Sequence, residues 1–136
     1  MKKNLLLFVS TLVLGLTSCS KDDDSSSDSS NIEGRWEYFQ EGTIVGGTET
    51  LVSWDHECTT KKDYVELLSG GVMKDMVYWD DCVDDVVTGT WSSYGTNFSA
   101  SIGGENTSGE ILTLTSSTLK IKYVDGGTTF VQVFKR

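Results

Sequence analysis

Short runs of apolar and β-branched residues, separated by pairs of glycines, constrain the fold of this chain more than any other feature of its sequence. Beyond the N-terminal region, no segment repeats apolar residues every three to four positions, as an amphipathic helix would. Alternation with a period of two occurs instead. Leu119, Ile121 and Tyr123 fall on one face of a strand, and Lys120 and Lys122 fall on the other. The pattern predicts an all-β domain.

Nine such runs predict nine strands. The glycine-containing links supply the positive φ that tight hairpins require, so consecutive strands are expected to pair antiparallel. An up-and-down meander of about eight strands removes its free edges by closing into a β-barrel, and a β-sandwich is the alternative fold. The predicted strands cover residues 35–40, 49–54, 63–68, 72–78, 89–93, 97–102, 110–115, 119–124 and 128–134.

The first residues of the chain have the layout of a secretory signal. Met1-Lys2-Lys3 is positive, Leu5–Leu16 is mostly apolar, and small polar residues then lead to Cys19. The apolar stretch is shorter than the roughly 20 residues that a membrane-spanning helix needs, so we expect residues 1–18 to be removed. Leu16-Thr17-Ser18-Cys19 resembles the lipobox of bacterial lipoproteins, which implies a lipid on the Cys19 sulfur and a membrane attachment through it.

Residues 20–31 contain one lysine, four aspartates and no apolar side chain. Such a segment cannot bury enough surface to offset its ordering entropy, so residues 19–31 are predicted to be a lipidated cysteine and a disordered tether. Lys21-Asp22-Asp23-Asp24 also resembles the acidic export signal of Bacteroidetes-type lipoproteins. That resemblance implies an outer-membrane protein exposed on the cell surface, with attachment facing the periplasm as the alternative.

The remaining residues, 32–136, are enough for one domain. They include sixteen acidic and eight basic residues, which gives a net charge of −8. This balance excludes an electrostatic attraction to nucleic acid or to an anionic membrane surface, and it favours cationic or neutral partners.

The three cysteines divide into one for lipid and two for the domain. With Cys19 acylated, Cys58 and Cys82 form an even pair in an oxidising compartment, and a disulfide between them is predicted. A metal site built from His56 and these two cysteines is the alternative, but it lacks a fourth ligand and a Cys-x-x-Cys pair.

Four carboxylates flank Cys82, and oxygen ligands on one loop suit calcium. Their spacing differs from that of a calcium-binding loop, so a solvated hairpin tip is the main interpretation. These residues are Asp80, Asp81, Asp84 and Asp85. The chain also has one histidine, no Gly-x-Ser-x-Gly elbow and no phosphate-binding glycine loop. We therefore expect no enzyme activity and no cofactor.

A family resemblance spans nearly the whole domain. Ile32-Glu33-Gly34-Arg35-Trp36, the Tyr64–Leu67 strand, Gly89-Thr90-Trp91 and Ser117–Ile121, together with the two cysteines, resemble the lipocalin-like lipoproteins of Bacteroidetes-type bacteria. The resemblance implies that the first Gly-x-Trp closes one end of the barrel and that the cysteines are bridged. The Gly46-Gly47 loop and the acidic insert after Tyr78 have no clear counterpart, which leaves the rim of a cavity undefined.

Large aromatic rings are candidates to line a cup for an apolar ligand. The alternative is that they fill the barrel, because eight strands enclose a space just wide enough for side chains. The expected function is binding of a small hydrophobic molecule without catalysis. The alternative is a filled barrel that meets another envelope protein or a host surface protein. The candidate rings are Trp36, Tyr38, Trp54, Tyr64, Tyr78, Trp91 and Phe98, with Trp36 expected to act as a plug.

Overall fold

The computed structural model of the protein describes residues 31–136. The predicted signal sequence, Cys19 and all of the predicted tether except Asn31 lie outside these residues. Within the described part, no helix has the length and apolar character needed to cross a membrane. The nine strands are β1 (Gly34–Val45), β2 (Thr48–Ser53), β3 (Tyr64–Leu68), β4 (Val72–Tyr78), β5 (Asp84–Tyr94), β6 (Asn97–Ile102), β7 (Glu105–Leu114), β8 (Thr118–Asp125) and β9 (Thr128–Lys135).

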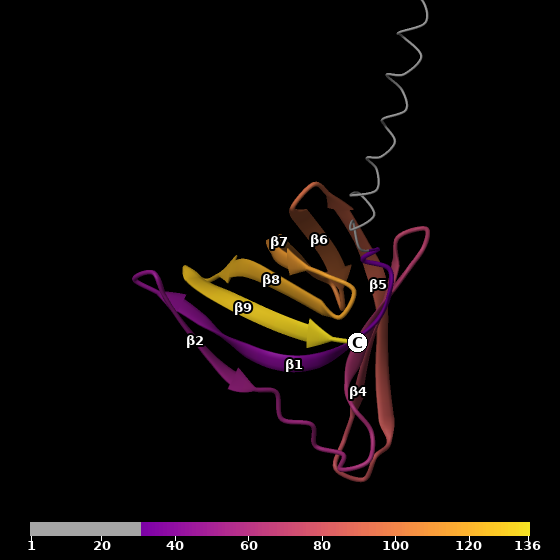
Figure 1. Cartoon of the computed structure of the whole chain (residues 1–136). Helices are drawn as coiled ribbons and strands as arrows, with labels where there is room; N and C mark the ends of the chain where they lie inside the picture. The colour runs from indigo at the N-terminus through magenta and orange to yellow at the C-terminus, as the bar shows by residue number, and fades with distance from the viewer. Residues whose placement is uncertain (1–30) are drawn as a thin grey trace, which may run out of the picture. The chain divides into compact units, whose positions relative to one another are not determined.

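A single antiparallel sheet closes on itself. The strand order is β2-β1-β3-β4-β5-β6-β7-β8-β9, and an additional pairing joins β1 to β9. That closing pair runs from Glu37 opposite Lys135 to Ile44 opposite Thr129, and Figure 1 shows the two strands side by side. Strands β1 and β3–β9 therefore form a closed barrel of eight strands, with β2 as an extra strand. The predicted barrel is confirmed, and the β-sandwich is excluded because one sheet supplies the closure.

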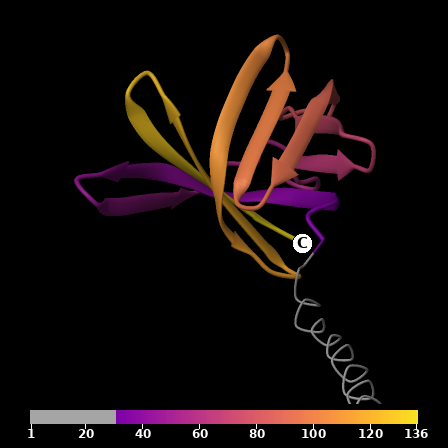
Figure 2. The ribbon, with the colours of Figure 1, turned by 90° about the horizontal axis from the view of Figure 1, so that it is seen from above.

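The first strand, β1, is twice as long as predicted and changes its neighbour partway along. Residues Gly34–Glu37 pair with β3, whereas Gln40–Val45 pair with β2. The expectation that β2 pairs with β3 is wrong, because the ten-residue link 54–63 carries the chain from β2 back to the start of β3. A β-bulge at Phe39 interrupts the pairing with β9 at this fork. The β1–β2 hairpin projects to one side of the molecule (Figure 2).

Glycine inside β1 permits a close approach of β2. A Cβ atom at Gly42 would lie 1.8 Å from the carbonyl oxygen of Thr50, which no side chain can occupy. At the predicted hairpin Gly46-Gly47, both residues have positive φ, 58° and 82°. Two other boundaries differ from prediction: β5 begins at Asp84 and β7 at Glu105. Both strands begin with polar residues, so the apolar pattern of the sequence does not reveal their first residues. The backbone nevertheless pairs from the preceding hairpin onward.

The end of the barrel where the described chain begins is closed by Trp36. Its side chain is fully buried, and its indole nitrogen donates a 2.8 Å hydrogen bond to the carbonyl oxygen of Ile32. The guanidinium of Arg136 lies 3.8 Å from the Trp36 ring centre and donates to the carbonyl oxygens of Glu33 and Asn31. Trp36 is thus a plug, as the resemblance implied.

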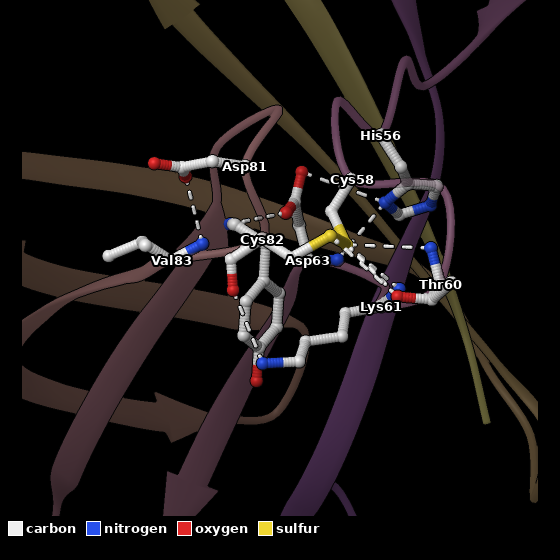
Figure 3. The surroundings of a disulfide bond; sticks show 9 residues. His56, Cys58, Thr60, Lys61, Asp63, Asp81, Cys82 and Val83 are labelled. Carbon is white, nitrogen blue, oxygen red and sulfur yellow. Dashed lines mark hydrogen bonds and ion pairs between the residues drawn. A yellow bond between two sulfur atoms is a disulfide. The ribbon is translucent and has the colours of Figure 1, made fainter.

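The predicted disulfide is present between Cys58 and Cys82, with sulfur atoms 2.03 Å apart. It joins the 54–63 link to the loop between β4 and β5 (Figure 3). The Lys61 ammonium donates a 3.2 Å hydrogen bond to the carbonyl oxygen of Cys82 across the same junction. The long link is therefore fixed to the barrel rather than held only by its ends.

Removing this bridge by the double substitution Cys58→Ser and Cys82→Ser is expected to lower the free energy of unfolding by about 3.5 kcal/mol. That value follows from the entropy of closing a loop of this length in the unfolded chain. Urea unfolding of both proteins measures it. A reducing agent should destabilise the native protein by a similar amount and leave the double variant unchanged. Equal stabilities of the native protein and the double variant would contradict the expectation.

Candidate functional site

A cavity of about 160 Å³ lies inside the barrel. Strand alternation turns aromatic and aliphatic side chains from six strands toward it, together with a few polar groups. An apolar cavity of roughly 150 Å³ accommodates one benzene-sized molecule, so this space is usable but small. Its lining is formed by Tyr38, Met73, Asp75, Phe98, Ala100, Ile102, Thr107, Ile121, Tyr123, Gln132 and Phe134.

A second hollow of about 270 Å³ adjoins the cavity where Tyr123 and Gln132 line both spaces. Glu41, Val52 and Phe130 contribute to this outer hollow. The ring of Tyr123 stacks on Phe130, with centres 5.6 Å apart, and the Gln132 amide donates a 2.9 Å hydrogen bond to the carbonyl oxygen of Gln40. Tyr123 and Gln132 therefore separate the cavity from the outer hollow beside the β1–β2 hairpin.

The cavity contains one hydrogen-bonded polar pair. The Tyr38 hydroxyl donates a 3.0 Å hydrogen bond to Oδ1 of Asp75. Burial raises the pKa of Asp75 above its usual range, the hydrogen bond from Tyr38 opposes this rise, and the nearby charges of Asp63 and Asp85 add to it. Burial also raises the pKa of Tyr38 well above its usual range, and the charge of Asp75 raises it further. The site therefore favours a proton, or another positive charge, beside Asp75.

Another carboxylate, Asp63, is fully buried and has a different environment. Only 2% of this residue is exposed. Its carboxylate oxygens accept hydrogen bonds of 2.8 Å from the indole nitrogen of Trp54 and from the backbone nitrogen of Tyr78. The backbone nitrogen of Asp63 donates to Nδ1 of His56 at 3.0 Å (Figure 3). Asp63 and His56 thus hold the barrel wall together and do not line the cavity.

Two of the seven candidate rings, Tyr38 and Phe98, line the cavity. Trp54 stacks against Tyr38, with ring centres 4.3 Å apart, and does not itself line the cavity. Trp91 packs against the core beside Phe98, and its indole nitrogen donates to the carbonyl oxygen of Leu68. Trp36 fills the closed end. Trp36, Trp54 and Trp91 therefore do not line the cavity.

The prediction that Tyr64 and Tyr78 line the cavity is wrong. Val65 and Leu67 occupy the inward positions of β3, so alternation places Tyr64 on the outer face, where the Arg35 guanidinium lies 3.5 Å from its ring centre. Tyr78 is likewise on the outer face of β4, and the Lys61 ammonium is 4.9 Å from its ring centre. Alternation within each strand decides these positions, whatever the ring's hydrophobicity.

The calcium interpretation of the acidic loop receives no support from the geometry. Asp84 and Asp85 are consecutive in β5 and pair with Tyr78 and Val77, so they face opposite sides of the sheet. Asp81 accepts a 3.0 Å hydrogen bond from the backbone nitrogen of Val83, which forms the turn itself. In residues 31–136, no group of three or more acidic, histidine or cysteine side chains, Asp80 included, is placed to hold a metal ion.

Sequence reasoning missed Asp75, although a signal for it exists. Met73, Asp75 and Val77 occupy one face of an alternating strand, and an acidic residue on an apolar face is the exception to the pattern. Lining residues such as Phe134 and Gln132 carry no comparable signal. They are recognised only when the register of β9 against β1 and β8 is known.

Comparisons with known proteins identify the fold. No protein-family model and no curated protein matches the chain. The crystal structure of a lipocalin-like protein from Bacteroides uniformis matches 77% of this chain and 97% of its own, with a TM-score of 0.54 and 15% identity. An uncharacterised protein from Bacteroides eggerthii matches 78% of this chain and 100% of its own, with a TM-score of 0.55 and 10% identity. The barrel is therefore lipocalin-like, as the sequence resemblance predicted.

Replacing Asp75 by asparagine is expected to stabilise the protein more at neutral pH than in acid. Because the pKa of Asp75 is raised in the folded state, its stabilising contribution is complete below its ordinary value of 3.8 and is lost as pH rises through the raised value. The variant lacks this loss. Urea unfolding at pH 7 and at about pH 3 measures the two stability differences.

The matched control is Asp80→Asn, which removes the same charge from an exposed loop position. Its stability relative to the native protein should change little between the two pH values. A difference for Asp75→Asn that does not grow toward neutral pH would show that the carboxyl of Asp75 is not disfavoured in the folded state.

Proposed function

We propose that this lipocalin-like barrel binds a small, mainly apolar molecule in its interior and catalyses no reaction. The observation that carries the proposal is the cavity of about 160 Å³, lined by aromatic and aliphatic side chains around a single carboxyl–hydroxyl pair. Apolar walls supply the affinity of such sites, and a few convergent polar groups fix the orientation of the ligand. The adjoining outer hollow gives an elongated ligand room to extend.

The polar groups at this site support binding rather than catalysis. Asp75 is hydrogen-bonded to the Tyr38 hydroxyl, which donates to it and offers no base of its own. The Nδ1 atom of His56 already accepts a hydrogen bond from the backbone of Asp63, and His56 does not line the cavity. A nucleophile activated by an adjacent base, the usual arrangement of covalent catalysis, is not formed by the lining residues.

The proposal includes a cellular location: a lipid on Cys19 holds the protein at the outer membrane, with the barrel exposed on the cell surface. The lipobox and the acidic segment after Cys19 support it. The described domain begins at Asn31 beside Arg136, at the end closed by Trp36. The outer hollow next to the β1–β2 hairpin thus lies toward the other end of the barrel from the point where the chain enters.

Binding to another envelope or host protein is the second candidate function. Bulky side chains exposed around the barrel favour it, since Tyr94 is 86% exposed, Val45 70% and Val124 64%. Such residues support a protein interface when they gather in one patch. Val45 and Val124 adjoin the hairpin turns that follow β1 and β8, whereas Tyr94 ends β5. The ligand-binding proposal is preferred because the cavity-lining groups come from six strands and converge on one space.

The cavity is tested by filling it. Ala100→Leu adds three carbon atoms to a lining residue, so a ligand that occupies the cavity should bind at least tenfold more weakly. Ser99→Leu, one position along β6 and exposed, is the matched control and should bind normally. Native mass spectrometry of each protein purified from its own host detects the bound molecule. The absence of any co-purified molecule from the native protein, or equal occupancy of the Ala100→Leu variant, would overturn the proposal.

The proposed location is tested separately with Cys19→Ala. Without the sulfur there is no site for the lipid, so the protein should move from the membrane fraction to the soluble fraction. Fractionation and metabolic labelling with a fatty acid measure the change. Retention of the variant in the membrane fraction would show that the anchor is not this cysteine.

A further inference from the structure

We propose that the ligand is an organic cation, a protonated amine on a small apolar body, and that its ammonium group binds Asp75 beside Tyr38. This inference rests on the proposed function and adds the chemical class of the ligand. It follows from the charges that face the cavity, the rings that surround them and the size of the space.

Asp75 faces the cavity without a positive partner. The cavity is lined by Asp75 and contains no lysine, arginine or histidine side chain. The ion pairs among residues 31–136 join Lys120 to Glu49, Lys122 to Glu110 and His56 to Asp63, and none of them includes Asp75. Its side-chain contact is the hydrogen bond from Tyr38 to one oxygen. A partly buried carboxylate of this kind is completed by a cation that donates a hydrogen bond.

The rings around Asp75 favour the same ligand. Tyr38, Phe98, Tyr123 and Phe134 all line the cavity. Tyr38 and Phe134 are in contact, with ring centres 5.0 Å apart. The faces of such rings attract an ammonium group by its charge, and the attraction is stronger where water is excluded. A neutral alcohol gains little from the rings, so the lining discriminates between the two.

The charges around Asp75, beyond the groups in direct contact with it, oppose the binding of an anionic ligand. Asp63 and Asp85 raise the pKa of Asp75 through their charges, so a negative potential extends over this region of the barrel. Glu41 lines the outer hollow, which shares Tyr123 and Gln132 with the cavity. The domain as a whole carries a net charge of −8, from sixteen acidic and eight basic residues. Cations are attracted toward the site, and carboxylates or phosphates are repelled from it.

The volume of the cavity limits the apolar body. About 160 Å³ is close to the space that holds one benzene ring. The inner part of the ligand is thus no larger than a single ring or a short branched chain. Any longer portion extends past Tyr123 and Gln132 into the outer hollow.

Three probes with the same ring, similar size and different charge test the inference: benzylammonium, benzyl alcohol and benzoate. Isothermal titration calorimetry at neutral pH measures their affinities for the purified intact protein. Benzylammonium should bind at least tenfold more tightly than benzyl alcohol, a difference of about 1.4 kcal/mol, and benzoate should bind most weakly. This comparison needs no variant, so it holds even where a substitution disturbs folding.

Two variants then assign the preference to one carboxylate. Asp75→Asn keeps the shape and an acceptor for Tyr38 but removes the charge, so the preference for benzylammonium should disappear. Asp80→Asn removes the same charge from an exposed loop position and should keep the preference. Both are compared under the same ionic strength, because distant charges are screened by salt.

The outcomes separate this inference from the proposed function. Equal affinity for the amine and the alcohol, or an unchanged preference in Asp75→Asn, overturns the inference while the barrel remains a binding protein. Failure of all three probes to bind, with no molecule co-purified from the host, overturns the proposed function and this inference with it.

Discussion

The structure depends on the fork at which β1 leaves β3 and joins β2. Three backbone and side-chain contacts of Asp63 hold it: its carbonyl oxygen accepts the Tyr38 amide at 3.1 Å, and its carboxylate accepts the Trp54 indole and the Tyr78 amide. On the other side of the fork, the Trp54 amide donates to the carbonyl oxygen of Phe39. Each of these donors would otherwise be unpaired inside the wall, which costs more than one net hydrogen bond is worth. The disulfide secures the link just beyond it.

The fork also explains why the barrel is full at one end and hollow further along. Near the closed end, β1 lies between β3 and β9, and Trp36, Leu67 and Leu119 are fully or almost fully buried. Beyond Tyr38, β2 replaces β3 beside β1, and no pairing in residues 31–136 joins β2 to β4. The sheet is split there, and the cavity begins at Tyr38, the residue that the fork fixes. One change of partner thus positions both the wall and the hydroxyl that holds Asp75.

The sequence predicts those features of this protein that depend on neighbouring residues, and it does not predict those that depend on contacts between distant residues. Period-two alternation and glycine turns depend on neighbouring residues, so the nine strands and the barrel were predictable, as was the cysteine pair. The fork was not, because the choice of β2 or β3 as partner depends on contacts between residues far apart in sequence, such as Tyr38 and Asp63. Alternation within β3 and β4 could have placed Tyr64 and Tyr78 on the outer face. The positions of Phe134 and Tyr123 in the cavity depend instead on the register between β8 and β9.

The buried carboxylate of Asp63 and the partly buried carboxylate of Asp75 show how structural and functional groups are told apart. Asp63 takes part in four hydrogen bonds through its backbone and side chain, so its burial is compensated within the protein. Asp75 breaks an apolar strand face and receives one hydrogen bond, and burial raises its pKa. A group that costs stability and remains incompletely paired is expected where selection acts on binding rather than on folding. The missing partner of Asp75 is therefore best sought outside the chain, in a ligand that brings its own positive charge.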